Sequence, residues 1–152
     1  MQVFIVGSPL ETAKVLDKKR LNKQIIECRQ ILNAIEGKTS AWINHPCTIQ
    51  YKENETWLWY YYQTLVFYRD FLNGVGDKYG FDNNENLYKA MCKNDVAQAY
   101  KPNFHTQDYF DNMKKRLYTK NHEHYKQWEC HGESYENWYW VNNQWKIYKQ
   151  KQ

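Results

Sequence analysis

A regular apolar pattern between residues 18 and 36 constrains this chain more than any other feature. The apolar side chains recur at steps of four, three, four and three residues, which places them on one face of an α-helix. They are Leu21, Ile25, Cys28, Leu32 and Ile35. Gly37 follows, as is typical of the residue that ends a helix in the left-handed conformation. The pattern predicts a helix over about 18–36 with one buried face.

A second, broader apolar face follows at about 54–73 and is rich in aromatic residues. A face this broad is typical of a helix in the core. Its stripe consists of Trp57, Tyr61, Thr64, Tyr68 and Phe71, widened by Leu58, Tyr62, Leu65 and Leu72. We expect the two helices to pack together, and Gly74 and Gly76 to end the second.

Shorter elements surround these two helices. The apolar lead at 2–6 predicts a short buried strand or an extended segment. Ser8 followed by Pro9 and Glu11 is a capping box, and it predicts a short helix over about 9–17. The remaining predicted elements are a polar turn at 77–84 and helices at about 85–99 and 107–118, the last one capped by Thr106.

The C-terminal region has a different pattern. A turn at Asn142 and Asn143 would place Trp140 opposite Trp145 and Trp138 opposite Ile147, with these four side chains on one face. This arrangement predicts a β-hairpin or an aromatic flap.

Length and composition fit one domain spanning residues 1–152. We therefore predict a mainly α fold, a compact single-domain helical bundle with a short N-terminal extended segment and a C-terminal aromatic hairpin. No stretch approaches the roughly 20 apolar residues of a membrane span, so no membrane partner is expected. The start of the chain lacks the pattern of a signal peptide, and the four cysteines form no CxxC pair. An intracellular, cytoplasmic and reducing location is expected.

Charge is unevenly distributed along the chain, whose net charge is +4. Residues 1–38 carry seven basic and four acidic side chains, and residues 111–128 carry five and two. Residues 52–100 carry five basic and seven acidic side chains. Basic flanks around an acidic middle suit a surface that faces phosphates, although solvated helix faces alone explain the pattern as well. The same two interpretations apply to the basic run at 114–120.

The polar stripe of the helix at 18–36 carries a carboxylate and two cations. On a helical wheel, Arg20, Lys23 and Glu27 lie away from the apolar face, and Gln24 lies beside them. A solvated face in which Lys23 and Glu27 form an i, i+4 pair explains these residues, and such a pair contributes only a few tenths of a kcal/mol. The spacing alone favours that interpretation.

A family resemblance gives this stripe a second interpretation. The segment LDKKRLNKQIIECRQIL, the loop with INHP and the aromatic helix after it resemble the pyrimidine-dimer DNA glycosylase family of phage endonuclease V type. The resemblance covers residues 1 to about 75. PNFH at 102–105 and HEHY at 122–125 resemble only small uncharacterised relatives of that family. The resemblance implies a mostly helical domain whose N-terminal segment passes through the middle, bringing the chain's own amine next to Glu27.

The implied chemistry joins these two groups. An α-amine has an ordinary pKa of about 7.7–8.0, so a useful fraction is a neutral nucleophile at cellular pH. In the resembled family the amine attacks C1′ of the damaged nucleotide and forms an imine. The carboxylate stabilises the cationic intermediate and assists the β-elimination that breaks the strand. The resemblance thus implies that Glu27 is catalytic and that Arg20 and Lys23 bind phosphates.

One difference from the family concerns the amine. The family uses the residue after the initiator methionine, typically a small one, whereas Gln2 is bulky enough to prevent removal of Met1. The working amine is then that of Met1, or else the lyase chemistry has been lost. A lysine could replace the amine only if its pKa were strongly lowered.

Histidines supply the remaining candidates. His45, in the NHP motif, and His105 are candidate substrate or phosphate ligands together with Gln24, and each is equally well explained as a histidine bonded to backbone. The spacing of His122, His124, Cys130 and His131 is not that of a standard zinc site, and it favours surface histidines. No metal and no cofactor is expected.

Three functions compete. The first is a DNA N-glycosylase, with or without lyase activity at abasic (AP) sites, acting on damaged or modified pyrimidines in duplex DNA. The second is a related enzyme acting on the N-glycosidic bond of a free nucleotide or nucleoside. The third is a non-catalytic module that binds nucleic acid or another partner through aromatic and basic side chains.

Overall fold

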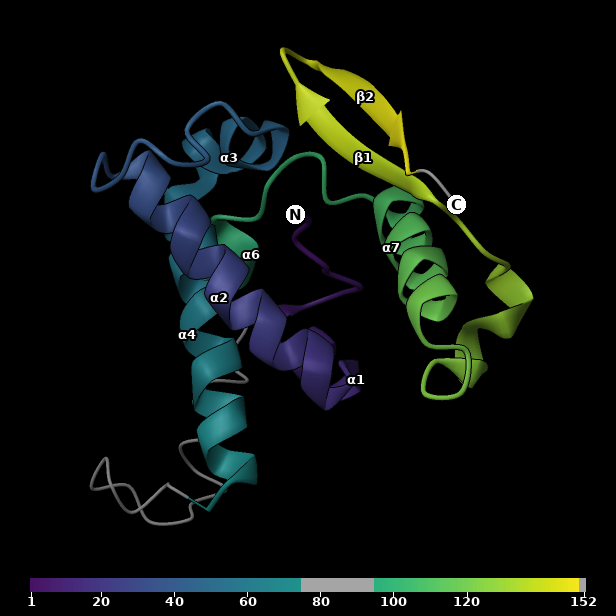
Figure 1. The fold of residues 1–152 in the computed structure, drawn as a ribbon. Coiled ribbons are helices and arrows are strands. Elements are labelled where there is room, and N and C mark those ends of the chain that lie inside the picture. The colour runs from purple at the N-terminus through teal and green to yellow at the C-terminus, as the bar shows by residue number, and fades with distance from the viewer. Residues whose placement is uncertain (75–94, 151–152) are drawn as a thin grey trace.

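The computed structural model describes residues 1–74 and 95–150 and confirms the mainly α fold (Figure 1). In chain order the elements are α1 (Pro9–Val15), α2 (Lys18–Ile35), α3 (Pro46–Tyr51), η1 (Lys52–Asn54), α4 (Glu55–Leu72), α6 (Asp95–Ala99), α7 (Gln107–Lys120), η3 (Lys126–His131), β1 (Glu136–Val141) and β2 (Gln144–Lys149). The predicted turn at 77–84 and most of the predicted helix at 85–99 lie outside the described residues. None of the helices in the described part is long and apolar enough to cross a membrane.

Local capping chemistry sets the helix ends. The Ser8 hydroxyl accepts a hydrogen bond from the Glu11 amide at 3.2 Å, and the Glu11 carboxylate accepts from the Ser8 amide at 3.3 Å, which confirms the predicted capping box. Gly37 ends α2 with a φ of +73°, also as predicted. The helix predicted at 9–17 stops at Val15, because Leu16 is extended. The helix after Thr106 runs two residues further than predicted, to Lys120.

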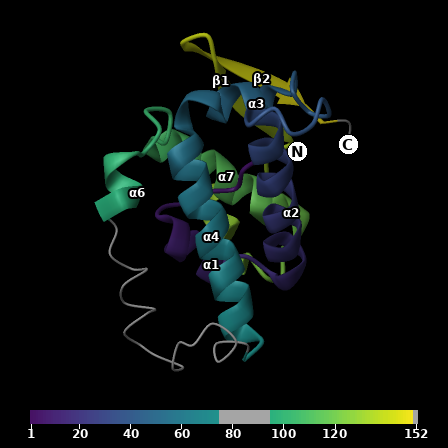
Figure 2. The same ribbon diagram turned by 90° about the vertical axis from the view of Figure 1, so that its left-hand side faces the viewer.

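The packing of α2 against α4 forms the centre of the core. The predicted face of α2 is buried at Leu21, Ile25, Cys28 and Leu32, and Tyr61 meets it from α4. The apolar stripe predicted for α4 includes residues at its C-terminal end that are not buried, however. Its final residues, Phe71 and Leu72, are 42% and 58% exposed, because the last turn of α4 projects beyond the body of the molecule (Figures 1 and 2).

Residues 1–6 run through the middle of the molecule between α2 and α7 (Figure 1). The segment is extended and has no strand partner among the described residues, yet Val3, Phe4 and Ile5 are buried. A buried backbone needs hydrogen-bond partners, and side chains supply them here. Thr12 of the neighbouring α1 supplies one partner, and the others come from Gln24 of α2, Tyr61 of α4, Tyr109 of α7 and Tyr139 of β1.

The C-terminal hairpin has the predicted register. Trp140 pairs with Trp145 and Trp138 with Ile147, so these four side chains share one face. Asn142 and Asn143 have φ values of 52° and 59°, as a two-residue type I′ turn requires. The opposite face of β1 is the more deeply buried one, through Tyr139 and Val141. The hairpin and α3 lie together at one end of the molecule (Figures 1 and 2).

Replacing Leu32 with Ala should lower the free energy of unfolding by about 2–5 kcal/mol, because a fully buried side chain is truncated in a packed core. Urea unfolding followed by circular dichroism measures this change. Ile26→Ala, on the 59% exposed side of the same helix, is the control and should be nearly neutral. Equal effects of the two substitutions would contradict the assigned orientation of α2.

Candidate active site

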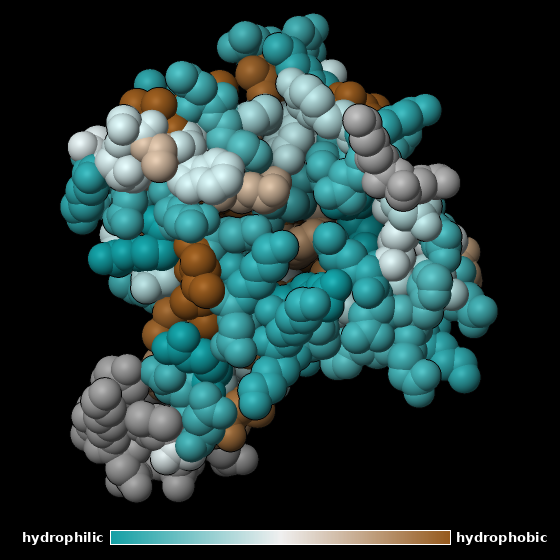
Figure 3. Space-filling model, viewed as in Figure 1, coloured by the Kyte–Doolittle hydropathy of each residue, from teal (hydrophilic) through white to brown (hydrophobic). Residues whose placement is uncertain are grey.

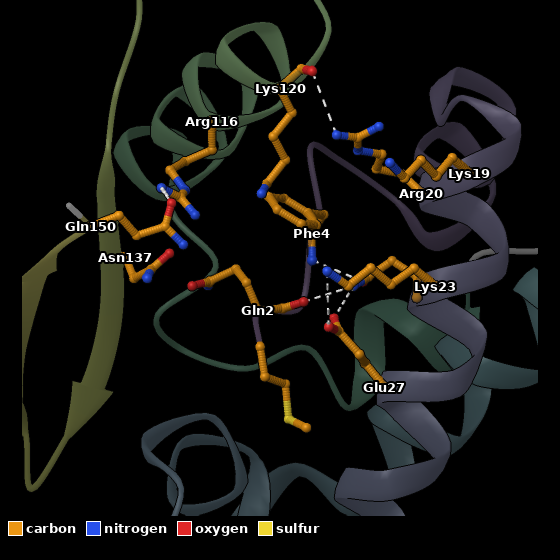
Figure 4. A pocket seen from close by; sticks show the side chains of 12 residues that line it. Gln2, Phe4, Lys19, Arg20, Lys23, Glu27, Arg116, Lys120, Asn137 and Gln150 are labelled. Atoms are coloured by element: carbon orange, nitrogen blue, oxygen red, sulfur yellow. Dashed lines mark hydrogen bonds and ion pairs between the residues drawn. The ribbon is translucent and has the colours of Figure 1, made fainter. Parts of the chain in front are cut away.

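A pocket opens between α2, α7 and β1, over the N-terminal segment (Figure 4). The face that contains it is largely hydrophilic and hollowed near its centre (Figure 3). The lining residues come from both ends of the chain and from the two helices: Met1, Gln2, Phe4, Lys19, Arg20, Lys23, Gln24, Glu27, Arg116, Lys120, Asn137 and Gln150. Of the predicted site residues, the structure brings Met1, Arg20, Lys23, Gln24 and Glu27 together here.

Glu27 presents a sheltered carboxylate to this pocket. Its side chain is 12% exposed, and Oε2 accepts a hydrogen bond from Gln24 Nε2 at 3.2 Å. Lys23 Nζ lies 3.8 Å from Oε1, but the lysine side chain is 64% exposed, so the pair contributes little to stability. The second expected cation, Arg20, instead pairs with Asp17 at 3.4 Å. Two contacts therefore fix the Glu27 carboxylate while leaving it open to the pocket.

Gln24 is the residue that joins α2 to the N-terminal segment. The helical wheel placed it beside the polar stripe, but it is 1% exposed. Its Oε1 accepts from the Phe4 amide at 2.9 Å, and its Nε2 donates to the Gln2 carbonyl at 2.6 Å as well as to Glu27. Gln24 thereby sets the position of the N-terminus relative to Glu27. Its contact with a substrate stays a prediction.

Cations from two helices face each other across the pocket. Lys19, Arg20 and Lys23 come from α2, and Arg116 and Lys120 come from α7 (Figure 4). Burial lowers the pKa of Lys120, and the charges of Arg116, Lys23 and Arg20 lower it further. Glu27 is the one acidic residue in the lining. The pocket is therefore electropositive, and a bound anion would relieve the repulsion.

Arg116 corrects the expectation that the basic run at 114–120 is a solvated face. It is 3% exposed, and its guanidinium donates to Gln150 Oε1 at 3.1 Å. No carboxylate pairs with it among the described residues. Lys114 does follow the solvated interpretation, because it pairs with Asp111 at 3.7 Å outside the pocket. A buried guanidinium without an acidic partner is typical of a site for an anionic ligand.

Three buried polar atoms in the wall of this pocket lack a hydrogen-bond partner: Gln2 Oε1, Arg116 Nε and Asn137 Oδ1. Each such group costs about 1–3 kcal/mol when nothing pairs with it. Among the described residues, three of the buried unpaired atoms thus belong to residues that line this pocket. Sequence patterns did not reveal Gln2 or Asn137 as site residues, because each reaches the pocket through contacts distant in sequence.

The N-terminal amine lies at the α3 side of the pocket. Tyr139 Oη donates to the Met1 carbonyl at 2.8 Å and so fixes the backbone of Met1. Burial lowers the pKa of His45, and the charge of the Met1 amine lowers it further, which places the amine near that ring. The described residues show no direct ion pair between the Met1 amine and Glu27. Met1 and Glu27 nevertheless line the same pocket.

Comparison with known protein families relates the first part of the chain to one of them. Residues 1–67 match the family model for pyrimidine dimer DNA glycosylase. This match confirms the resemblance of the first half of the chain to that family. At the level of the family, the match supports a role in DNA repair as a glycosylase. No curated protein and no solved structure matches the chain.

The glycosylase match covers one side of the pocket. It includes the N-terminal segment and all of α2, and therefore Met1, Gln24 and Glu27. The lining residues of α7 and the hairpin lie beyond residue 67. Arg116, Lys120 and Asn137, on the other side of the pocket, lie outside the matched residues.

The two candidate histidines lie outside this pocket. His45 Nδ1 accepts from the Cys47 amide at 3.0 Å and caps α3. His105 is 3% exposed, and its Nε2 lies 2.9 Å from Tyr51 Oη. Burial lowers the pKa of His105 to about 3, with a smaller contribution from Lys101. His105 is therefore a neutral histidine enclosed by aromatic rings in the core.

The C-terminal histidines have separate partners. His122 Nε2 lies 2.6 Å from a Glu133 oxygen, and His124 Nε2 lies 2.9 Å from the Val15 carbonyl. The described residues contain no group of three or more side chains able to hold a metal ion.

We expect Gln24→Leu to lower the free energy of unfolding by about 2–4 kcal/mol, because it leaves the buried Phe4 amide and Gln2 carbonyl unpaired. Chemical unfolding measures the loss, and Asn22→Leu on the exposed side of α2 is the matched control. If Gln24→Leu were as stable as the control, the N-terminal segment would not depend on this amide.

Proposed function

We propose that this protein is a DNA N-glycosylase that acts on damaged or modified pyrimidines in duplex DNA, with Glu27 and the Met1 amine as its catalytic groups. One observation carries the proposal. Met1, which carries the chain's amine, and the sheltered carboxylate of Glu27 line one electropositive pocket, and both residues belong to the segment that matches the glycosylase family.

The chemistry follows from the two groups. The neutral amine attacks C1′ of the damaged nucleotide, and the bond between C1′ and the base breaks as the base leaves. Loss of a proton from the attached nitrogen and opening of the sugar give an imine. Glu27 stabilises the positive charge that develops at C1′, and its fixed position means that it does not have to reorganise during the reaction. Removal of a C2′ proton then expels the 3′ phosphate and breaks the strand, which is the lyase step.

Phosphates are the natural occupants of the cationic rim. Lys23 is exposed at the edge of the pocket, whereas Arg116 and Lys120 lie deeper on the α7 side. Cations on both sides of the pocket can bind the two phosphates that flank the reacting sugar in a DNA strand. A free nucleotide carries its charge at one end and would leave part of this rim unpaired. The two-sided distribution of charge therefore favours DNA as the substrate.

Glu27→Gln should abolish cleavage of the glycosidic bond while leaving most of the DNA affinity, because it removes the negative charge but keeps the shape and the bond from Gln24. Alkali-labile strand breaks in a duplex oligonucleotide that contains a pyrimidine dimer measure activity, because the detached base stays joined to its neighbour in the dimer. Glu53→Gln, an exposed carboxylate outside the pocket, is the control and should retain full activity.

Borohydride reduction tests the nucleophile in the same assay, because it traps an imine as a stable protein–DNA adduct. Acetylation of the amine, checked by mass spectrometry, should abolish trapping, whereas Lys18→Ala or Lys19→Ala should not. Full activity of Glu27→Gln would refute the role of the carboxylate. Trapping that is lost only on lysine replacement would move the nucleophile to that lysine.

Lys23→Glu should weaken DNA binding and reduce the slope of log K against log salt by about one, because one phosphate contact is lost. Fluorescence anisotropy across a salt series measures the slope. Lys52→Glu changes the net charge equally but lies outside the pocket, so it should leave the slope nearly unchanged. A shallow slope in the unaltered protein would instead support a nucleotide substrate.

A further inference from the structure

The loop between α2 and α3 presents two large apolar side chains to solvent. Trp42 is 45% exposed and Ile43, its neighbour at the tip, is 48% exposed. A hydrogen bond of 3.0 Å from the His45 amide to the Trp42 carbonyl closes the turn. About half of each side chain is therefore open to solvent, where it is available to contact a partner.

The backbone at Trp42 is strained. Its φ of +66° lies in the left-handed region, where a side chain costs free energy and glycine does not. Such conformations concentrate at functional sites, because the surrounding structure must hold them in place. The chain therefore keeps a bulky ring at a position where the backbone conformation favours glycine.

The ring is also anchored beside the candidate catalytic amine. Trp42 makes an edge contact with His45, with centroids 5.7 Å apart, and His45 makes another with Tyr139 at 6.0 Å. Tyr139 in turn donates to the Met1 carbonyl. His45 cannot turn freely, because its Nδ1 caps α3. Two ring contacts and one hydrogen bond thus connect Trp42 to the backbone of Met1.

We infer that Trp42 is a wedge that enters the base stack of duplex DNA and fills the space left by the extruded nucleotide, with Ile43 flanking it. The inference rests on the proposed glycosylase function. A duplex hides the C1′ that the amine must reach, so the nucleotide has to leave the stack. Proteins that open a base step insert apolar side chains into it. The cationic pocket, which Trp42 reaches through His45, Tyr139 and Met1, would bind the same DNA through its phosphates, which favours nucleic acid over an apolar protein partner.

The decisive variant is Trp42→Gly, because it separates function from stability. Glycine accepts a φ of +66° without the cost that a side chain has there, which offsets part of the packing lost with the half-exposed ring, so this variant should remain folded at the assay temperature. Its kcat/KM on a dimer-containing duplex should nevertheless fall about tenfold or more, since the base step is no longer held open. Trp42→Phe keeps an aromatic wedge and should retain most of the activity. Ile49→Ala removes a comparably exposed side chain of α3 and is the control.

Two further measurements, activity on single-stranded DNA and the fluorescence of 2-aminopurine, distinguish the role of Trp42 from the proposed catalytic chemistry. On a single strand carrying the same lesion, Trp42→Gly should match the unaltered protein, because no stack has to be opened. 2-Aminopurine placed beside the lesion brightens when it is unstacked, and this brightening on binding should require Trp42 but not Glu27.

The outcomes are distinct. Equal duplex activity of Trp42→Gly and the unaltered protein would refute the wedge and leave the proposed function standing. Brightening that depends on Trp42, in a protein that cleaves no DNA, would support the wedge and refute the glycosylase. Absence of both cleavage and brightening in the unaltered protein would refute both proposals.

Discussion

The extended segment at residues 1–6 organises the rest of the structure, because side chains and not a neighbouring strand satisfy its buried backbone. Each of its amides and carbonyls must find a partner inside the protein. Gln24, Tyr61, Tyr109 and Tyr139 reach it from α2, α4, α7 and β1. The four elements therefore have to meet around one piece of chain. The distance between α2 and α7, the opening of the pocket and the position of the N-terminus are consequences of this single requirement.

Local chemistry made much of the fold predictable from sequence. The apolar period of α2 gave the helix and its buried face, because residues three and four apart share a side of a helix. Ser8 and Glu11 gave the start of α1, since their side chains bond amides only three residues away. Asn142 and Asn143 gave the hairpin register, because few other residues accept two consecutive positive φ values. Each of these features depends on near neighbours in the chain.

The candidate site depended on distant partners and was only partly predictable. Gln24 was expected among solvated side chains, because a helical wheel does not show that an unpaired backbone segment lies against it. Arg116 was expected to be solvated, since its burial follows from the hairpin and the chain end beside it. Asn137 carries no signal in sequence. Glu27 was found through family resemblance, as the spacing of its neighbouring charges also fits an ordinary helix surface.

The pocket has lining residues from both ends of the chain, and this has a consequence for its formation on the ribosome. Met1, Gln2 and Glu27 leave the ribosome before Asn137 and Gln150 do. Until then the carbonyl of Met1 lacks Tyr139, its partner from the hairpin. Contacts between such distant residues also form late in folding, because closing a long loop costs entropy. A chain that still lacks α7 and the hairpin therefore holds Met1 and Glu27 without the opposite wall, and the pocket forms only when these later elements have folded.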